Sequence, residues 1–287
     1  MLKSDQIVPL LLCQSCRENS LTVGDAGLVC GDCGASTPVH GNRLDFEAAH
    51  PSLSEEWRAQ QAVALPEYNS DEYNVDITLP QLFGAFMAVS LDRHAKVLDV
   101  GCGITKQVPP YVAQLNLQNY LGLEPYRVSV LPNFPMLSGA IAECMPIRAQ
   151  VLDAVIFATS MDHIVGIDEA MEETKRVLKP GGRIYMWIGL FDPDTIAKVK
   201  TFDVIWRGGP VKKALRFAAA QIEYAHTLWK MRDRAKKLAS GVRLDPFHCR
   251  YYTRERIASD LQRWGLAERR ALVVPGTNSM FVEAQRA

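Results

Sequence analysis

The sequence lacks net charge, because 32 Lys and Arg side chains balance 32 Asp and Glu side chains over 287 residues. This excludes a uniformly cationic surface that coats nucleic acid or an anionic membrane, although a local basic face is still allowed. Long hydrophobic runs are also lacking. The apolar stretch from Ile7 to Leu12 is far too short to span a membrane, and no small-residue cleavage site follows it. We therefore expect a cytoplasmic protein.

Cysteine is too scarce for a disulfide scaffold, with seven residues in the whole chain. Four of the seven form two Cys-x-x-Cys pairs, Cys13 with Cys16 and Cys30 with Cys33, and thirteen residues separate the pairs. Each pair can direct two thiolates at one ion, and two pairs complete the closed tetrahedral shell that is typical of structural zinc. The spacing predicts a structural Zn²⁺ site made of these four cysteines.

Residues 1–46 are expected to form a small domain around that ion, with short strands at 21–23 and 28–29. A unit of this size buries little core, so the ion is expected to supply its folding free energy. Residues 11–46 resemble the zinc ribbons that are fused to, or partner, methyltransferases. Such ribbons bind RNA, bind proteins or brace a neighbouring domain, and the sequence leaves these roles open.

Residues 47–78 are expected to be an acidic linker. The segment contains seven acidic side chains and only one Lys or Arg, Arg58, and its two prolines interrupt any long helix. The main domain is then 79–287, opening with an amphipathic helix at 79–91.

The strongest signal is the apolar strand that begins at Lys96 and ends in the turn Asp99-Val-Gly-Cys-Gly103. Glycine is needed where the backbone must approach a ligand closely, so Gly101 and Gly103 are predicted cofactor contacts. A second strand ends at Glu124, 21 residues beyond Gly103. This separation places a carboxylate at the tip of the neighbouring parallel strand, where it can accept hydrogen bonds from ribose hydroxyls.

Further segments follow in order: Leu123-Glu-Pro125, Ala142-Glu-Cys-Met-Pro146, Leu152-Asp-Ala-Val155 and Arg176-Val-Leu-Lys-Pro-Gly-Gly182. Together with the glycine turn, this series resembles the signature of class I S-adenosylmethionine-dependent methyltransferases between about 96 and 190. The resemblance implies an α/β fold with a seven-stranded, mainly parallel, doubly wound Rossmann-like sheet. It also implies S-adenosylmethionine as the cofactor.

Carried over by position, the resemblance places Asp99, Gly101 and Gly103 on the methionine side of the cofactor. It places Glu124 at the ribose and Ala142 and Glu143 beside the adenine, where Pro125 is expected to form an apolar wall. Ser160 follows the carboxyl end of an apolar strand, so it is expected to face the methyl acceptor or the sulfonium. The chain departs from the pattern twice. Thr105 replaces a glycine of the turn, and Ile141 replaces an acid that often binds the adenine amino group.

Ser160-Met-Asp-His163 follows an apolar strand at 151–159, and ligands of open α/β sheets lie beyond the carboxyl ends of such strands. His163 is therefore a candidate general base that Asp162 could orient, with a packing role as the alternative. His248 is a second candidate, because it precedes the helix capped by Thr253 near the expected acceptor pocket.

Residues 197–243 form an insertion that the minimal fold does not require. The insertion contains twelve basic and three acidic side chains, which gives a net charge of +9, and apolar residues recur at helical spacing. We expect a helical lid. Its basic face is either simply solvated or attracts an anionic acceptor, a membrane surface that carries a lipid-linked acceptor, or RNA phosphates.

The leading prediction is methyl transfer to an oxygen of a small molecule, a sugar, or a glycan or lipid-linked intermediate. The first alternative is an rRNA or tRNA base methyltransferase that grips RNA with the ribbon, which the neutral chain disfavours. The second alternative is a non-catalytic, cofactor-binding partner subunit. The sequence does not indicate an oligomeric state.

Overall fold

The computed structural model describes residues 7–24, 27–46, 59, 62, 77–126, 131–194, 196–198, 210–240, 242 and 248–286. For 210–219 it describes the backbone alone. Most of the predicted acidic linker, 47–78, lies outside the described residues. The same holds for 199–209, 241 and 243 of the predicted insertion.

Seven strands of the main domain lie side by side in the order β7-β6-β5-β8-β9-β11-β10. The first five run parallel, whereas β11 pairs antiparallel with both β9 and β10. The central strands are almost continuously apolar, as expected for strands that are covered on both faces. The seven are β5 Lys96–Val100, β6 Asn119–Glu124, β7 Met136–Ser138, β8 Leu152–Ala158, β9 Leu178–Gly189, β10 Leu266–Val273 and β11 Ser279–Arg286.

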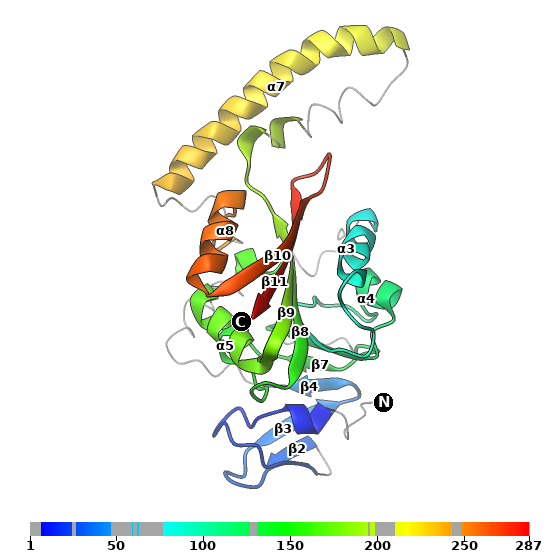
Figure 1. The fold of residues 1–287 in the computed structure, drawn as a ribbon, viewed down its shortest axis with the longest axis vertical. Coiled ribbons are helices and arrows are strands. Elements are labelled where there is room, and N and C mark those ends of the chain that lie inside the picture. Colours follow the sequence, from blue (N-terminus) through cyan, green and yellow to red (C-terminus); the bar gives the residue numbers. More distant parts are fainter. Residues whose placement is uncertain are drawn as a thin grey trace.

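Helices cover both faces of this sheet (Figure 1). One face carries α3 Thr78–Ala88 and α4 Pro110–Leu115, and the other carries α5 Ile167–Val177 and α8 Arg254–Arg263. The Thr253 hydroxyl accepts a hydrogen bond from the Arg256 amide, so it caps α8 as the sequence predicts. The helix predicted at 79–91 and the helix predicted after Thr253 are confirmed within a few residues.

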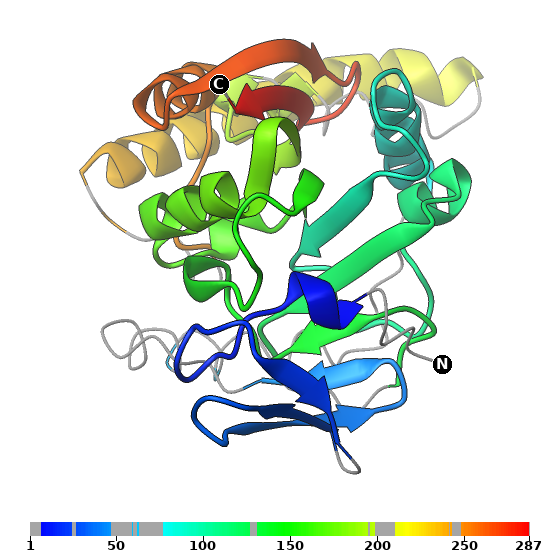
Figure 2. The ribbon, with the colours of Figure 1, turned by 60° about the horizontal axis from the view of Figure 1, so that its bottom comes forward.

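Four further strands belong to the N-terminal ribbon: β1 Leu21–Val23, β2 Gly27–Cys30, β3 Ser36–His40 and β4 Arg43–Asp45. Strand β4 pairs in parallel with the edge strand β7, with Leu44 opposite Leu137, so the ribbon continues the main sheet (Figure 2). The expectation of a seven-stranded sheet is therefore wrong, because the sheet has eleven strands within the described residues. The β7 edge would otherwise leave backbone N–H and C=O groups unpaired, and β4 satisfies them.

The ribbon also shares the core of the main domain. Leu11, Leu44 and Phe46 are at most 1% exposed, and they belong to the same apolar cluster as Met145 and Ile147. A short 3₁₀ helix, η1 Val8–Leu10, precedes a β-bridge between Leu11 and Ile147. Burial against the main domain therefore adds to whatever an ion contributes to the stability of the ribbon.

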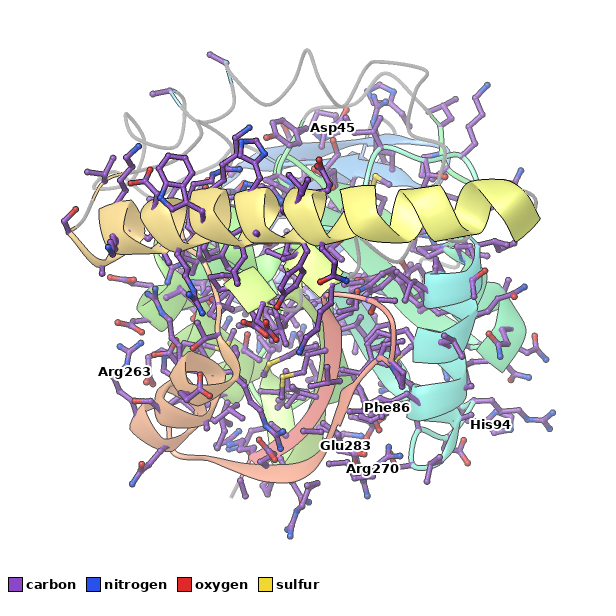
Figure 3. The ribbon with its side chains drawn as sticks, turned by 90° about the horizontal axis from the view of Figure 1, so that it is seen from above. Asp45, Phe86, His94, Arg263, Arg270 and Glu283 are labelled. Carbon is purple, nitrogen blue, oxygen red and sulfur yellow. The ribbon has the colours of Figure 1, made fainter. Side chains whose placement is uncertain are left out.

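The C-terminal hairpin is held by Glu283 on β11, which is 1% exposed. Its carboxylate accepts hydrogen bonds from Arg270 Nε on β10 (2.6 Å) and from the Ser90 hydroxyl (2.9 Å), and it pairs with Arg183 on β9. The Arg270 guanidinium also lies 4.4 Å from the ring centre of Phe86 on α3 (Figure 3). A buried carboxylate that is paired in this way fixes the hairpin to the sheet and to α3.

The helix α7, Pro210–Ala239, lies within the predicted insertion. It crosses the end of the molecule opposite the ribbon (Figures 1 and 3). Thr227 and Met231 are buried in the part of α7 whose side chains are described. The Tyr224 hydroxyl donates a hydrogen bond to Asp194 Oδ1 (2.6 Å). No helix in the described part of the chain combines the length and the apolar character needed to cross a bilayer.

Candidate active site

The turn that follows β5 requires glycine at two positions. Gly101 has φ +74°, and a Cβ atom there would lie 2.6 Å from Cβ of Ser160. Gly103 has φ +84°, but nothing lies within 4 Å of the place a Cβ would take. Gly101 is therefore fixed by packing against the loop after β8, whereas the backbone at Gly103 faces open space that a ligand can fill.

Glu124 connects this turn to the end of β6. Its Oε2 accepts a hydrogen bond from the Gly103 amide (2.9 Å), and its Oε1 accepts one from the Tyr126 amide (3.2 Å). The residue is 3% exposed, and burial raises the pKa of Glu124 to about 7 even though both amides favour the ionised form. The carboxyl group therefore changes its protonation state near neutral pH.

Asp99 lies behind the turn rather than in it. It is fully buried, and its Oδ2 accepts hydrogen bonds from the hydroxyls of Tyr111 (2.7 Å) and Tyr120 (2.8 Å). Burial raises the pKa of Asp99 to about 6. Asp99 thus supports the base of the turn from the face that α3 and α4 cover. The structure gives it no place on the surface of the cavity described next.

A cavity of about 950 Å³ opens at the carboxyl ends of β5, β6 and β8. Its walls are largely apolar, with Ile104, Val108, Tyr126 and Trp187 among them, and no Lys or Arg lines it within the described residues. Eight of the predicted site residues line it: Gly101, Gly103, Glu124, Pro125, Ala142, Glu143, Ser160 and His163. Asp99, Asp162 and His248 do not, and neither does any described side chain of α7.

One wall of the cavity is the 3₁₀ helix η2, Ala142–Cys144. Glu143 is 4% exposed, and its Oε1 accepts a hydrogen bond from the Gly166 amide at the start of α5 (3.0 Å). The ribbon contacts the same helix, because Arg17 Nη1 lies 3.3 Å from Sγ of Cys144. The position of this wall therefore depends on both α5 and the ribbon.

The loop after β8 begins with a strained residue. Thr159 has φ +57°, which is unusual for a β-branched side chain, and its amide donates a hydrogen bond to the Trp187 carbonyl (2.8 Å). The next hydroxyl, that of Ser160, donates to the Val100 carbonyl (2.5 Å). Strain of this kind is common where a loop must present side chains to a ligand. Here Thr159, Ser160 and the last residue of the 3₁₀ helix η3, Met161–His163, line the cavity described above.

Asp162, His163 and His248 form a histidine–aspartate cluster beside the cavity. Nε2 of His163 lies 3.7 Å from Oδ1 of Asp162, and Nε2 of His248 lies 3.5 Å from Oδ2 of the same carboxylate. The two imidazole ring centres are 4.9 Å apart. The structure thus brings together the two candidate bases and the acid between them, although 85 positions separate the two histidines in the sequence.

The four cysteines of the ribbon also converge. Sγ of Cys13 lies 3.6 Å from Sγ of Cys33, Sγ of Cys16 lies 3.6 Å from Sγ of Cys30, and all four sulfurs are within 4.8 Å of one another. A tetrahedral ion with Zn–S bonds of about 2.3 Å places its sulfurs about 3.8 Å apart. The donor set and its spacing fit a zinc ion.

Comparisons with known proteins identify the main domain. A family model described as "Methyltransferase domain" matches residues 98–186. A 1,6-didemethyltoxoflavin-N1-methyltransferase from Burkholderia thailandensis, solved with bound 1,6-didemethyltoxoflavin and S-adenosylhomocysteine, has a similar fold. The TM-score is 0.51 at 13% identity, with 90% of this chain and 97% of that chain covered. An S-adenosylmethionine-dependent methyltransferase from Thermotoga maritima, described as a possible histamine N-methyltransferase, gives a TM-score of 0.45 and 13% identity, with 80% and 99% covered. A search of curated proteins found no match.

Residues 98–186 thus match a methyltransferase domain, as the order of the motifs predicts. The likeness to the Burkholderia thailandensis enzyme shows that the fold around this segment is one that methyltransferases use.

Sequence reasoning missed several residues that shape this site. Tyr111 and Tyr120 hold Asp99, and nothing in their sequence context indicates a polar task. Arg250 was also missed, although its Nη2 donates hydrogen bonds to the carbonyls of Ile164 (3.0 Å) and Val165 (2.9 Å) and so joins the loop after β8 to the segment before α8. Its position two residues after His248 was the only signal that could have suggested this.

Proposed function

We propose that the chain methylates an oxygen atom of a small acceptor, such as a hydroxylated small molecule, a sugar, or a sugar carried by a larger glycan or lipid. The observation that carries this proposal is the placement of His163 on the cavity wall with Asp162 and His248 directly behind it. Loss of a proton makes a hydroxyl oxygen a better nucleophile, and a cluster of this kind at the acceptor side promotes that loss.

The cofactor is assigned to the side of the cavity formed by the turn after β5. The backbone at Gly103 is open to a ligand, and any larger side chain at this position would fill that space. The Glu124 carboxyl group lies next to it and can accept hydrogen bonds from ribose hydroxyls. Pro125, Ala142 and Glu143 then lie on the adenine side, and Gly101 and Ser160 lie on the methionine side. When bound, S-adenosylmethionine supplies an activated methyl group on sulfur.

Asp99 has a different task in this proposal. It holds the turn in place through Tyr111 and Tyr120 rather than contacting the cofactor. The histidine–aspartate cluster is assigned to the acceptor, where the residues need only hold an oxygen in line with the methyl group and promote departure of its proton. A structural zinc ion is assigned to Cys13, Cys16, Cys30 and Cys33, since the sulfur spacing fits it.

Two observations favour a small, uncharged acceptor over RNA. The cavity lies near the upper end of the range of about 300–1,000 Å³ for ligand pockets, which leaves room for a second molecule beside the cofactor. No Lys or Arg in the described lining meets a phosphate, and the ribbon arginines Arg17 and Arg43 are already paired with Glu173 and Asp45. Helix α7 is basic, and contact between α7 and an anionic membrane would bring the site to a lipid-linked acceptor.

The test is methyl transfer by the full-length chain to extracts of small molecules and, in parallel, to total RNA, with mass spectrometry for a gain of one CH₂ group. We expect a product in the small-molecule arm, loss of that product in H163A, and full activity in H94A, a matched variant of an exposed histidine away from the cavity. Methylated RNA alone would overturn the small-acceptor proposal. Cofactor binding without any product would favour a non-catalytic partner subunit.

A further inference from the structure

The backbone fixes the histidine–aspartate cluster independently of its side chains. The Asp162 carbonyl accepts hydrogen bonds from the amides of Cys249 (2.7 Å) and Arg250 (3.3 Å). The Arg250 side chain closes the same junction through the carbonyls of Ile164 and Val165. Two segments distant in the sequence are therefore joined at the position where His163 and His248 meet, so the cluster is pre-organised.

The side-chain donors of the cluster are spaced like ligands rather than like hydrogen-bond partners. The two Nε2-to-carboxylate distances of 3.7 Å and 3.5 Å exceed the usual N–H···O range, and all three donor atoms lie within 4.8 Å of one another. Ligands about 2.1 Å from a common ion lie about 3.0 to 3.4 Å apart. The two nitrogen-to-oxygen distances exceed that spacing by a few tenths of an ångström, and the 4.8 Å limit on the remaining separation leaves at most about 1.4 Å to close.

The charges around the cluster also suit a cation. One carboxylate stands between two imidazoles, and within the described residues no Lys or Arg forms an ion pair with Asp162. The guanidinium of Arg250, on the joined segment, donates hydrogen bonds to two backbone carbonyls instead of pairing with the carboxylate. Among the residues that the structure describes, this carboxylate charge therefore has no permanent cationic partner.

We propose that Asp162, His163 and His248 bind one divalent first-row transition-metal ion, with Nε2 of each histidine and an oxygen of the carboxylate as ligands. Two imidazoles and one carboxylate suit Mn²⁺, Fe²⁺, Co²⁺, Ni²⁺ or Zn²⁺, whereas Mg²⁺ and Ca²⁺ prefer ligand sets made of oxygen. Three protein ligands leave open positions on the ion, as in catalytic metal sites.

The open side of such a site faces the acceptor, since His163 lines the cavity. This part of the inference rests on the proposed function. A cation there would bind the acceptor oxygen and lower the pKa of its hydroxyl group, so that the proton leaves to solvent. His163 and His248 would then act as ligands, and Asp162 would be a ligand rather than an orienting acid.

The experiment is a titration of the full-length, zinc-loaded chain with Mn²⁺, in which electron paramagnetic resonance measures free Mn²⁺. Manganese prefers nitrogen and oxygen ligands, so it leaves the four-cysteine site undisturbed. We expect one Mn²⁺ ion per chain in the wild type, and binding weaker by at least about tenfold in D162N and in H248A. The matched control is H40A. His40 Nε2 lies 3.5 Å from Oδ2 of Asp45 in the ribbon, so it has the same kind of histidine–carboxylate pair, and this variant should bind Mn²⁺ like the wild type.

Equal Mn²⁺ binding in the wild type and D162N, or none in either, would overturn the metal site. Retained S-adenosylmethionine binding in D162N and H248A shows that these variants are folded. The two proposals fail separately. Transfer that continues unchanged in a chelator, with the ribbon zinc retained, removes the metal site and leaves the proposed function intact. If the chain binds Mn²⁺ through the cluster but methylates no oxygen, the metal site stands and the proposed function is wrong.

Discussion

Nη2 of Arg17 lies 3.1 Å from Oε2 of Glu173, and this ion pair joins the ribbon to helix α5. Arg17 Nη1 also donates a hydrogen bond to the Met145 carbonyl (3.0 Å), while the Met145 amide donates to the same Glu173 oxygen (2.8 Å). These bonds hold the residue directly after the 3₁₀ helix η2. Two residues of η2, Ala142 and Glu143, line the cavity. The ribbon is thus part of the scaffold of the cofactor wall.

Replacing Arg17 with alanine should therefore weaken both stability and cofactor binding. Three hydrogen bonds are lost and Glu173 loses one of its two arginine partners. Because Arg17 is about one-third exposed, we expect a loss of about 1–2 kcal/mol of unfolding free energy, together with a higher Kd for S-adenosylmethionine. Thermal unfolding and calorimetric titration measure the two effects.

The matched control for Arg17 is the exposed pair of Lys237 and Asp233 on α7 (2.8 Å). The K237A variant should change the unfolding free energy by less than about 0.5 kcal/mol and leave cofactor binding unchanged. If R17A binds the cofactor as tightly as K237A does, the ribbon has no part in positioning the wall.

Loss of the zinc ion proposed for the ribbon should have a larger effect than loss of Arg17. Cys33 is exposed, so C33S removes one sulfur ligand without opening a buried cavity. We expect the variant to lose its zinc, to unfold at a lower temperature and to bind S-adenosylmethionine more weakly, because β4 and Arg17 both depend on the ribbon fold. Metal analysis and thermal unfolding check this result. A zinc-free chain with unchanged stability would show that packing alone holds the ribbon.

The sequence predicted those features that depend on local patterns. The glycine turn at 101–103, the acid at Glu124 and the cysteine pairs follow from spacing along the chain. The turn and Glu124 line one cavity, and the four cysteines lie within 4.8 Å of one another. The parallel pairing of β4 with β7 was not predictable, because it joins segments about 90 residues apart through backbone groups that carry no sequence signal. The orientation of Asp99 was missed for a similar reason. It depends on tyrosines contributed by α4 and β6, and only the tertiary structure places them next to the carboxylate.

The two glycines of the turn should respond differently to alanine. Both have positive φ, so each substitution costs about 1–2 kcal/mol of backbone strain. G101A adds a clash with Ser160 and should lower the unfolding temperature further, whereas G103A places a methyl group in open space and should mainly weaken cofactor binding. Thermal unfolding and the Kd for S-adenosylmethionine separate the two effects. Equal loss of cofactor binding at equal stability would contradict this division.

Glu124 should make the stability of the free enzyme depend on pH. Burial raises its pKa from 4.5 to about 7, so between these values the folded chain binds more protons than the unfolded chain. The unfolding free energy therefore falls as pH rises through this window, and the contribution of Glu124 is constant above it. In E124Q this part of the pH dependence should disappear, and denaturant titrations at several pH values measure the difference.

The same carboxyl group should link cofactor binding to pH with the opposite sign. Ribose hydroxyls donate to the ionised form, so binding favours loss of the proton, and the affinity for S-adenosylmethionine should rise as pH increases through about 7. Asp99 lies nearby and its negative charge also raises the pKa of Glu124, so D99N should shift this rise to lower pH. Calorimetric titrations in two buffers of different ionisation enthalpy would detect release of the proton below pH 7. No proton release in the wild type, or the same release in E124Q, would mean that Glu124 does not hold the ribose.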